Sequence, residues 1–146
     1  MELPILTPEE ASLPYAKYFK LPLADIPQEK LDIWNGPAAP AESALPFEDR
    51  ALFQSADVPG LQNGFTIAPN GTGFVANTTF MPGVTAEMFD WWFGWHSVGP
   101  DLRYKLWDHD DHFHARAHDP SYVLDPSVPV SQKTWGMNHQ IKENIG

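Results

Sequence analysis

The hydrophobic pattern of the chain changes near residue 62. Residues 1–62 carry short apolar groups interrupted by prolines, without a long periodic stretch. At residues 7–10, TPEE supplies an N-cap, a proline at the first helical position and a capping-box glutamate, which predicts a short helix. Residues 28–34 precede Asn-Gly and predict a second helix, and residues 46–53 add one turn. We expect an irregular N-terminal arm packed on a larger domain, because such a stretch does not fold alone.

The pattern becomes β-like in residues 64–81. Two runs rich in β-formers flank Asn70-Gly71, which is a strong hairpin signal. In the second run Phe74 and Ala76 lie on one face, and Val75 lies on the other. We therefore expect an antiparallel hairpin.

Residues 85–96, TAEMFDWWFGWH, have the period of a helix. Thr85 caps it, and only Glu87 and Asp90 are clearly polar. We therefore expect a largely buried helix that ends before Gly99-Pro100. One face of this helix carries the side chains at i, i+4, i+7 and i+8, namely Met88, Trp92, Trp95 and His96.

The remaining segments are less regular. Residues 102–107 are short and apolar, and their periodicity does not decide between strand and helix. Residues 119–129 are expected to form a loop. Near the C-terminus His139, Ile141 and Glu143 fall on one side of a predicted strand, and a helix would also place His139 and Glu143 on one face. The fold class expected from these elements is α+β.

Composition restricts the partners and the chemistry. The chain has 146 residues, enough for one core, and a formal charge of −10, which argues against nucleic acid and anionic membranes. No apolar run is long enough for a transmembrane span, and the N-terminus has no signal-peptide pattern, so a soluble cytoplasmic protein is expected. Because the chain has no cysteine, any metal must be held by histidine and carboxylate.

Histidines and acids concentrate in residues 91–119, beside four of the six tryptophans. Imidazoles and carboxylates suit zinc or another first-row divalent ion, but spacing alone leaves a metal site and a solvated surface equally open. A calcium loop is excluded, since Phe113 stands where a glycine is required. The histidines of this stretch, apart from His96 at the helix end, are His109, His112, His114 and His118. His96 is expected to be a core residue, and Tyr104 is either a pocket donor or plain core.

The motifs M-P-G-V-T-x-E-M, W-W-x-x-W-H, R-Y-K-x-W and D-H occur in this order between residues 81 and 112. Together with a final segment HQIKENIG, this order resembles the diacetylphloroglucinol hydrolase and phloretin hydrolase family. The resemblance covers about residues 64–146. It implies a zinc-dependent hydrolase that cleaves the carbon–carbon bond between an acyl group and a phenolic ring. It also implies a homodimer in which residues 63–146 form the first part of a Bet v 1-like, helix-grip catalytic domain.

The resemblance assigns roles to particular residues. The first zinc histidine falls on His112 and the first zinc glutamate on Glu143. A catalytic, substrate-contacting tyrosine falls on Tyr104, and Trp95 and Trp107 are expected to bind the phenolic ketone substrate as walls of the pocket, with Trp91 and Trp92 beside them. The two other zinc ligands, a histidine and a glutamate one helical turn apart, lie further along the family sequence, so the chain is expected to be truncated. At Ala115 the family has an asparagine, so the substrate is not expected to be oriented identically here.

Two other readings stay open at this stage. The chain is alternatively a non-catalytic helix-grip module that binds a hydrophobic aromatic ligand. It is also interpretable as a separately encoded half that needs a partner chain. In all readings, the roles of His96, His109, His114, His118 and His139 stay unassigned.

Overall fold

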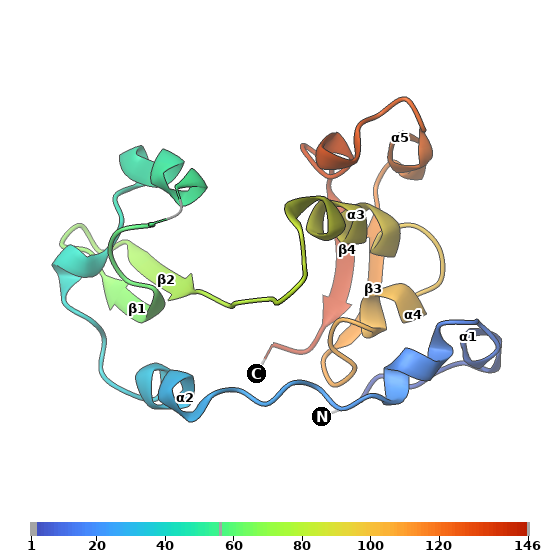
Figure 1. Cartoon of the computed structure of the whole chain (residues 1–146), viewed down its shortest axis with the longest axis horizontal. Helices are drawn as coiled ribbons and strands as arrows, with labels where there is room; N and C mark the ends of the chain where they lie inside the picture. The colour runs from blue at the N-terminus through green and yellow to red at the C-terminus, as the bar shows by residue number, and fades with distance from the viewer. Residues whose placement is uncertain (1–2, 56, 146) are drawn as a thin grey trace. The chain divides into compact units, whose positions relative to one another are not determined.

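The computed structural model describes residues 3–55 and 57–145, which form two compact units (Figure 1). One unit comprises Met1–Leu23 with Pro82–Gly146, and the other comprises Ala24–Met81. The first unit therefore joins an N-terminal segment to the C-terminal part of the chain. Both units mix short helices with two-stranded antiparallel sheets, so the expected α+β class is confirmed.

The unit Ala24–Met81 contains the predicted hairpin and helix. Strands β1 (Asn63–Ile67) and β2 (Gly73–Asn77) pair antiparallel, and α2 (Gln28–Trp34) packs on β1. Gly71, in the hairpin loop, has a φ of +85°, which explains the need for glycine there. Two short 3-10 helices complete the unit, η2 (Ala41–Ser43) and η3 (Phe47–Gln54). The predicted helix, hairpin and extra turn are all confirmed.

The N-terminal segment of the other unit begins with α1 (Pro8–Ala11), followed by η1 (Ala16–Lys20). The predicted capping box is present, because the Thr7 hydroxyl accepts from the Glu10 amide and the Glu10 carboxylate accepts from the Thr7 amide. The sequence signal at this position therefore predicted the helix start correctly.

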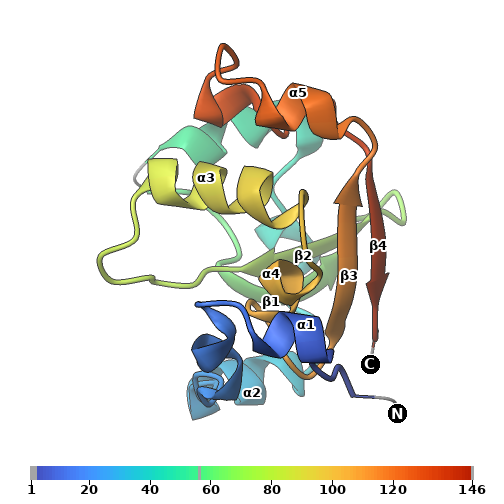
Figure 2. The same ribbon diagram turned by 90° about the vertical axis from the view of Figure 1, so that its right-hand side faces the viewer.

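The C-terminal part of this unit contains α3 (Ala86–His96), α4 (Leu102–Lys105), β3 (His112–Ala117), α5 (Pro120–Leu124), η4 (Val130–Gln132) and β4 (His139–Glu143). Figure 2 shows β3 and β4 lying side by side, with α4 against β3. A small core of Val98, Ala117 and Val123 joins the end of α3, β3 and α5, and Met137 packs on it. The predicted C-terminal strand is confirmed.

A β-bulge sets which side chains of β3 face inward. His112 pairs with Glu143, but the next pair is His114 with Lys142, so Phe113 is the extra residue. Without the bulge, His112 would share a face with His114. With it, His112 lies on the face that carries the buried Ala115 and Ala117.

Two sequence expectations were wrong. Residues 119–129 are not all loop, because Asp119 caps α5 through the amides of Ser121 and Tyr122, and Pro120 occupies its first turn. Helix α3 is also not largely buried. Met88 and Trp91 are about half exposed, and the buried residues of the helix, Gly94 and His96, lie at its C-terminal end.

The helices are short. Within residues 3–55 and 57–145, none is long and apolar enough to cross a membrane. Residues 102–107, whose structure the sequence left undecided, contain the single turn of α4.

Candidate functional site

Three side chains from three elements meet in the unit that contains β3 and β4. Tyr104 comes from α4, His112 begins β3 and Glu143 ends β4. The Tyr104 hydroxyl donates to Glu143 Oε2 at 2.5 Å, and His112 Nε2 lies 3.6 Å from the same oxygen. The Tyr104 and His112 rings stack with centroids 4.0 Å apart. The structure thus brings together the tyrosine and the two metal-ligand candidates expected from the sequence.

Local sequence explains how these side chains are positioned. Gly99, with a φ of +114°, changes the direction of the backbone after α3, so that α4 can pack on β3. Leu102 anchors that turn, since its side chain is fully buried. The bulge at Phe113 then directs His112 toward Glu143, so the site depends on two local irregularities of the backbone.

Tyr104 is held as a hydrogen-bond donor. Burial raises the pKa of the Tyr104 phenol above its ordinary value near 10, and the hydrogen bond to the Glu143 carboxylate raises this pKa further. Its side chain is nearly covered, at 7% exposure, whereas the Glu143 side chain is 34% exposed. The phenol therefore stays protonated across the physiological range, with its proton directed at a carboxylate that solvent and ligands can reach.

The two ring nitrogens of His112 have different neighbours. Nδ1 lies 3.4 Å from the Tyr104 carbonyl oxygen, a contact that suits an N–H donor at this position. Nε2 faces Glu143 Oε2. In the tautomer that carries its proton on Nδ1, Nε2 presents the lone pair that a metal ligand requires.

The aromatic rings continue beyond His112 as a row. Tyr104 is followed by His96, at 5.3 Å between centroids, and His96 by His139, at 6.3 Å. Burial lowers the pKa of His96 to about 4, although its hydrogen bond to the Trp92 carbonyl acts in the opposite direction. Burial also lowers the pKa of His139. These two histidines are therefore neutral near pH 7.

Tryptophans pack against this row at His96. Trp92 packs against His96 at 6.0 Å and against Trp107 at 5.6 Å between centroids. Trp95 stacks on Trp91 at 5.1 Å and receives the Arg103 guanidinium over its face at 4.6 Å. The tryptophans expected to form pocket walls thus form one aromatic cluster, which contacts His96.

The distance between His112 Nε2 and Glu143 Oε2 is compatible with a shared zinc ion. Two ligands about 2.0–2.1 Å from a tetrahedral zinc ion lie about 3.3 Å from each other. The 3.6 Å between His112 Nε2 and Glu143 Oε2 is close to this value, so the pair fits two ligands of one ion. Among the described residues, no group of three or more His, Cys, Asp or Glu side chains is arranged to hold a metal. The pair therefore fits part of a coordination shell.

The other histidines of residues 91–119 have structural contacts or lie on the surface. His109 contacts Asp110 Oδ1 and the Leu21 carbonyl, both at 3.0 Å, and so attaches the N-terminal segment. His114 Nδ1 lies 2.7 Å from Asp101 Oδ1. His118 is exposed. None of these three lies with His112 and Glu143 in a group of metal-ligand candidates.

Some features of the site carried no sequence signal. The row from His112 to His139 requires residues that are far apart in sequence. An ion pair between Glu10 and Lys105 beside Tyr104 joins residues 95 positions apart. The capping box identified Glu10 as a helix-start residue, but its spacing gave no indication of a buried lysine partner.

Comparison with known proteins adds a family to this geometry. A family model described as the DAPG hydrolase PhiG domain matches residues 45–146. A phloretin hydrolase of Eubacterium ramulus is 52% identical over 139 residues, covering 94% of this chain and 51% of the relative. A 2,4-diacetylphloroglucinol hydrolase of Pseudomonas protegens is 30% identical, covering 91% and 43%. The chain thus spans about half the length of the curated relatives it matches.

Proposed function

Because this chain belongs to the DAPG hydrolase PhiG domain family, we propose that it supplies part of the active site of a carbon–carbon bond hydrolase. The substrate class is a phenolic ketone whose acyl group is attached to a phloroglucinol-type ring. Water adds across the bond, so that the acyl group leaves as a carboxylic acid and the ring carbon gains a hydrogen. The observation that carries this proposal is that the Tyr104 hydroxyl and His112 Nε2 converge on the same carboxylate oxygen of Glu143.

Zinc is the proposed cofactor, with His112 Nε2 and Glu143 Oε2 as two of its ligands. When bound, it supplies a Lewis acid that polarises an acyl carbonyl and lowers the pKa of water. The Tyr104–His112 stack supports this role, because it fixes the orientation of the imidazole. The family resemblance attributes the two other ligands to a histidine and a glutamate in a later part of the family sequence.

Tyr104 is the proposed contact for a phenolic oxygen of the substrate. Its O–H already donates to Glu143, and its raised pKa keeps that proton in place. The phenolic oxygen of a substrate bound beside Glu143 would accept the hydrogen bond of the Tyr104 hydroxyl, either in place of Glu143 or together with it. The hydrogen bond would then orient the ring with its acyl carbon toward His112 and Glu143.

The phenolic hydroxyl of the substrate explains why the bond between the acyl group and the ring can break. A carbanion is a poor leaving group, but a hydroxyl ortho to the acyl group allows the ring carbon to be protonated as a keto tautomer. After water has added to the carbonyl, the acyl–ring bond breaks and its electron pair shifts through the ring onto the ketone oxygen, which takes a proton and restores the phenol. The part played by Tyr104 is to hold the phenolic oxygen during this proton movement.

Fold, assembly and location are proposed from the same resemblance. We propose a Bet v 1-like, helix-grip domain from residue 63 onward, preceded by the proline-rich arm of residues 1–62. A homodimer in the cytoplasm is proposed with it. Helices packed on antiparallel strands are the coarser feature that supports this proposal.

The proposal is tested with a chimera that joins this chain to the remaining half of the Eubacterium ramulus phloretin hydrolase. We expect the chimera to contain zinc, to hydrolyse phloretin and to lose activity in the presence of a chelator. The His112→Ala variant should lose both zinc and activity. The exposed His118→Ala is the matched control and should keep both.

Two outcomes would redirect the proposal. A folded chimera that binds phloretin but never cleaves it, with or without zinc, would support the alternative of an aromatic-binding module. The observation that favours this alternative is the exposure of the tryptophans of α3, which are exposed or half-buried. Activity of the 146-residue chain by itself would contradict the division of the ligands between two parts of the sequence.

A further inference from the structure

We propose that Glu10 and Lys105 are positioning residues, which hold Tyr104 against His112 and Glu143 from the far side of α4. The inference rests on the proposed function for the role of Tyr104 toward the substrate, but the link between the ion pair and Tyr104 is a matter of geometry. Glu10 belongs to α1, and Lys105 is the next residue after Tyr104.

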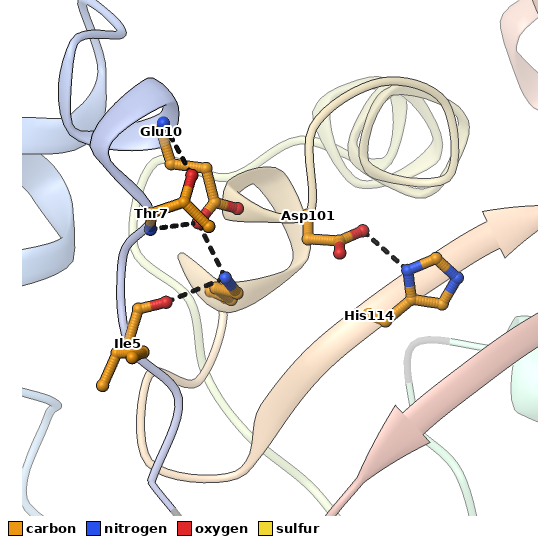
Figure 3. A network of polar contacts seen from close by, with 6 residues as sticks. Ile5, Thr7, Glu10, Asp101 and His114 are labelled. Atoms are coloured by element: carbon orange, nitrogen blue, oxygen red, sulfur yellow. Dashed lines mark hydrogen bonds and ion pairs between the residues drawn. The ribbon is translucent and has the colours of Figure 1, made fainter.

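The ion pair has a complete set of hydrogen bonds. Lys105 Nζ lies 2.8 Å from Glu10 Oε2 and also donates to the Ile5 carbonyl at 2.9 Å. The same Glu10 oxygen accepts from the Thr7 amide at 3.0 Å. Figure 3 shows Ile5 and Glu10 directed at the same amino group, while Thr7 is directed at Glu10. The capping box of α1 and the lysine of α4 thus form one network.

Burial makes this network strong. The Lys105 and Glu10 side chains are only 9% and 8% exposed. Leaving either charge buried without its partner is strongly unfavourable, so the two helices are held at one mutual position. A second ion pair of α4, between Asp101 and His114, is more than a third exposed on both sides and constrains the turn much less.

The geometry of a short helix transmits this constraint to Tyr104. Helix α4 has four residues, and a single turn does not hold its own position without external contacts. Successive residues on a helix point about 100° apart, so Lys105 reaches α1 while Tyr104 reaches β3 and β4. A rotation or slide of the turn that moves Lys105 must therefore also move the Tyr104 ring.

The position of Tyr104 matters for the site because two contacts share it. Its ring stacks on His112 and its hydroxyl reaches Glu143. A misplacement of about 1 Å at a reacting group costs on the order of 100-fold in rate. The N-terminal segment therefore contributes to the site without touching it.

The test uses the NMR resonances of the His112 ring in the intact chain. These protons lie over the Tyr104 ring and are displaced upfield by its ring current. In Glu10→Gln, which leaves Lys105 buried beside a neutral amide, we expect most of this displacement to be lost. The exposed neighbour Glu9 provides the matched control, and Glu9→Gln should leave the resonances unchanged.

A double variant separates positioning from stability. Glu10→Gln with Lys105→Met removes both charges, so we expect its thermal unfolding to approach that of the wild type. The His112 resonances should still be shifted toward the unstacked position. If the double variant is folded and keeps the stacked resonances, the ion pair only attaches the N-terminal segment and the proposal is wrong.

Activity provides a second and distinguishable readout. In the chimera with the phloretin hydrolase half, the double variant should lower kcat/KM by about 10- to 100-fold while zinc content is unchanged. If the unmodified chimera is folded and inactive, the proposed function fails, but the NMR result still decides the positioning role. An unchanged kcat/KM in an active chimera would overturn the positioning role.

Discussion

The imidazole of His112 lies parallel to the phenol ring of Tyr104, with centroids 4.0 Å apart and an interplanar angle of 1°. The two rings come from different elements, and the bulge at Phe113 is what brings them to the same face. Stacking fixes the plane of the imidazole, while the Tyr104 hydroxyl fixes Glu143. One tyrosine thus orients both candidate metal ligands.

Replacing Tyr104 by phenylalanine separates its two roles. The ring stack is kept, and the loss of the O–H should lower the free energy of unfolding by at most about 1 kcal/mol, because the partly exposed Glu143 can bind water instead. In the chimera we expect kcat/KM for phloretin to fall by about 100- to 1,000-fold, since the substrate phenol loses its donor. Urea unfolding and steady-state kinetics are the measurements.

The matched control is Tyr122→Phe. Tyr122 also donates its hydroxyl, to the Gln132 carbonyl, but lies on α5 outside the site. Tyr122→Phe should lower the free energy of unfolding by a similar amount and leave kcat/KM unchanged. Equal kinetic losses in the two variants would contradict a specific role for Tyr104.

Local signals predicted α1, α2, α3 and the hairpin, and failed for α4 and α5. The capping box at Thr7, the glycine after α2 and the Asn70-Gly71 turn act within a few residues, so the sequence displays them directly. Helix α4 is a single turn, for which periodicity carries no information. Helix α5 was missed although Asp119-Pro120 is a helix-start signal, because the prolines that follow suggested a loop.

The site itself depended on contacts between distant residues. His112 and Glu143 were expected from the family resemblance, and the strand alternation of residues 139–143 agrees with their pairing. Neither the Glu10–Lys105 ion pair nor the row through His96 could be predicted, because each requires the packing of the whole unit. The exposure of α3 was also unpredictable, since an apolar helix does not reveal how much of its surface is covered.

Gly99 is predicted to be intolerant of a side chain. Its φ of +114° is unfavourable for alanine, and a Cβ would lie 2.9 Å from the Arg103 guanidinium carbon. That guanidinium is held by the carbonyls of Trp95 and Val98, so it cannot move away without losing these hydrogen bonds. We expect Gly99→Ala to lower the free energy of unfolding by about 2–4 kcal/mol, measured by urea unfolding.

Gly83 supplies the comparison for this substitution. It also has a positive φ, of +76°, but nothing lies within 4 Å of the Cβ that alanine would add. Gly83→Ala should therefore cost only the backbone contribution, about 1 kcal/mol. A loss for Gly99→Ala no larger than that for Gly83→Ala would show that Arg103 does not constrain the end of α3.

Stability is predicted to fall as the pH drops from about 6.5 to about 4. The folded-state pKa of His96 is lowered to about 4 by burial, whereas the unfolded chain has the ordinary value of 6.5. Between pH 4 and pH 6.5 the unfolded state binds more protons than the folded state. The free energy of unfolding therefore increases as the pH rises and decreases as the pH falls. The expected loss is on the order of 2–3 kcal/mol, and His139 acts in the same direction.

The pH dependence is measured by thermal unfolding across this range. In His96→Phe, which keeps an aromatic ring in the row but cannot bind a proton, the slope between pH 6.5 and 4 should be reduced. The exposed His118→Phe is the control and should retain the slope. A slope that is unchanged in His96→Phe would assign the acid sensitivity to other groups.

Zinc binding by the 146-residue chain is predicted to be weak and confined to His112 and Glu143. A complete four-ligand structural site contributes about 10–16 kcal/mol, so half of the ligands should give about 5–8 kcal/mol, a Kd of about 1–200 μM. Competition with a chromophoric chelator measures this affinity.

Four variants test which residues bind the zinc. His112→Ala and Glu143→Gln should each abolish zinc binding, while His118→Ala and His109→Ala should not. If all four variants weakened binding equally, zinc would be held by the surface histidines without a defined site. The geometry argues for the defined pair, because His112 Nε2 lies 3.6 Å from Glu143 Oε2.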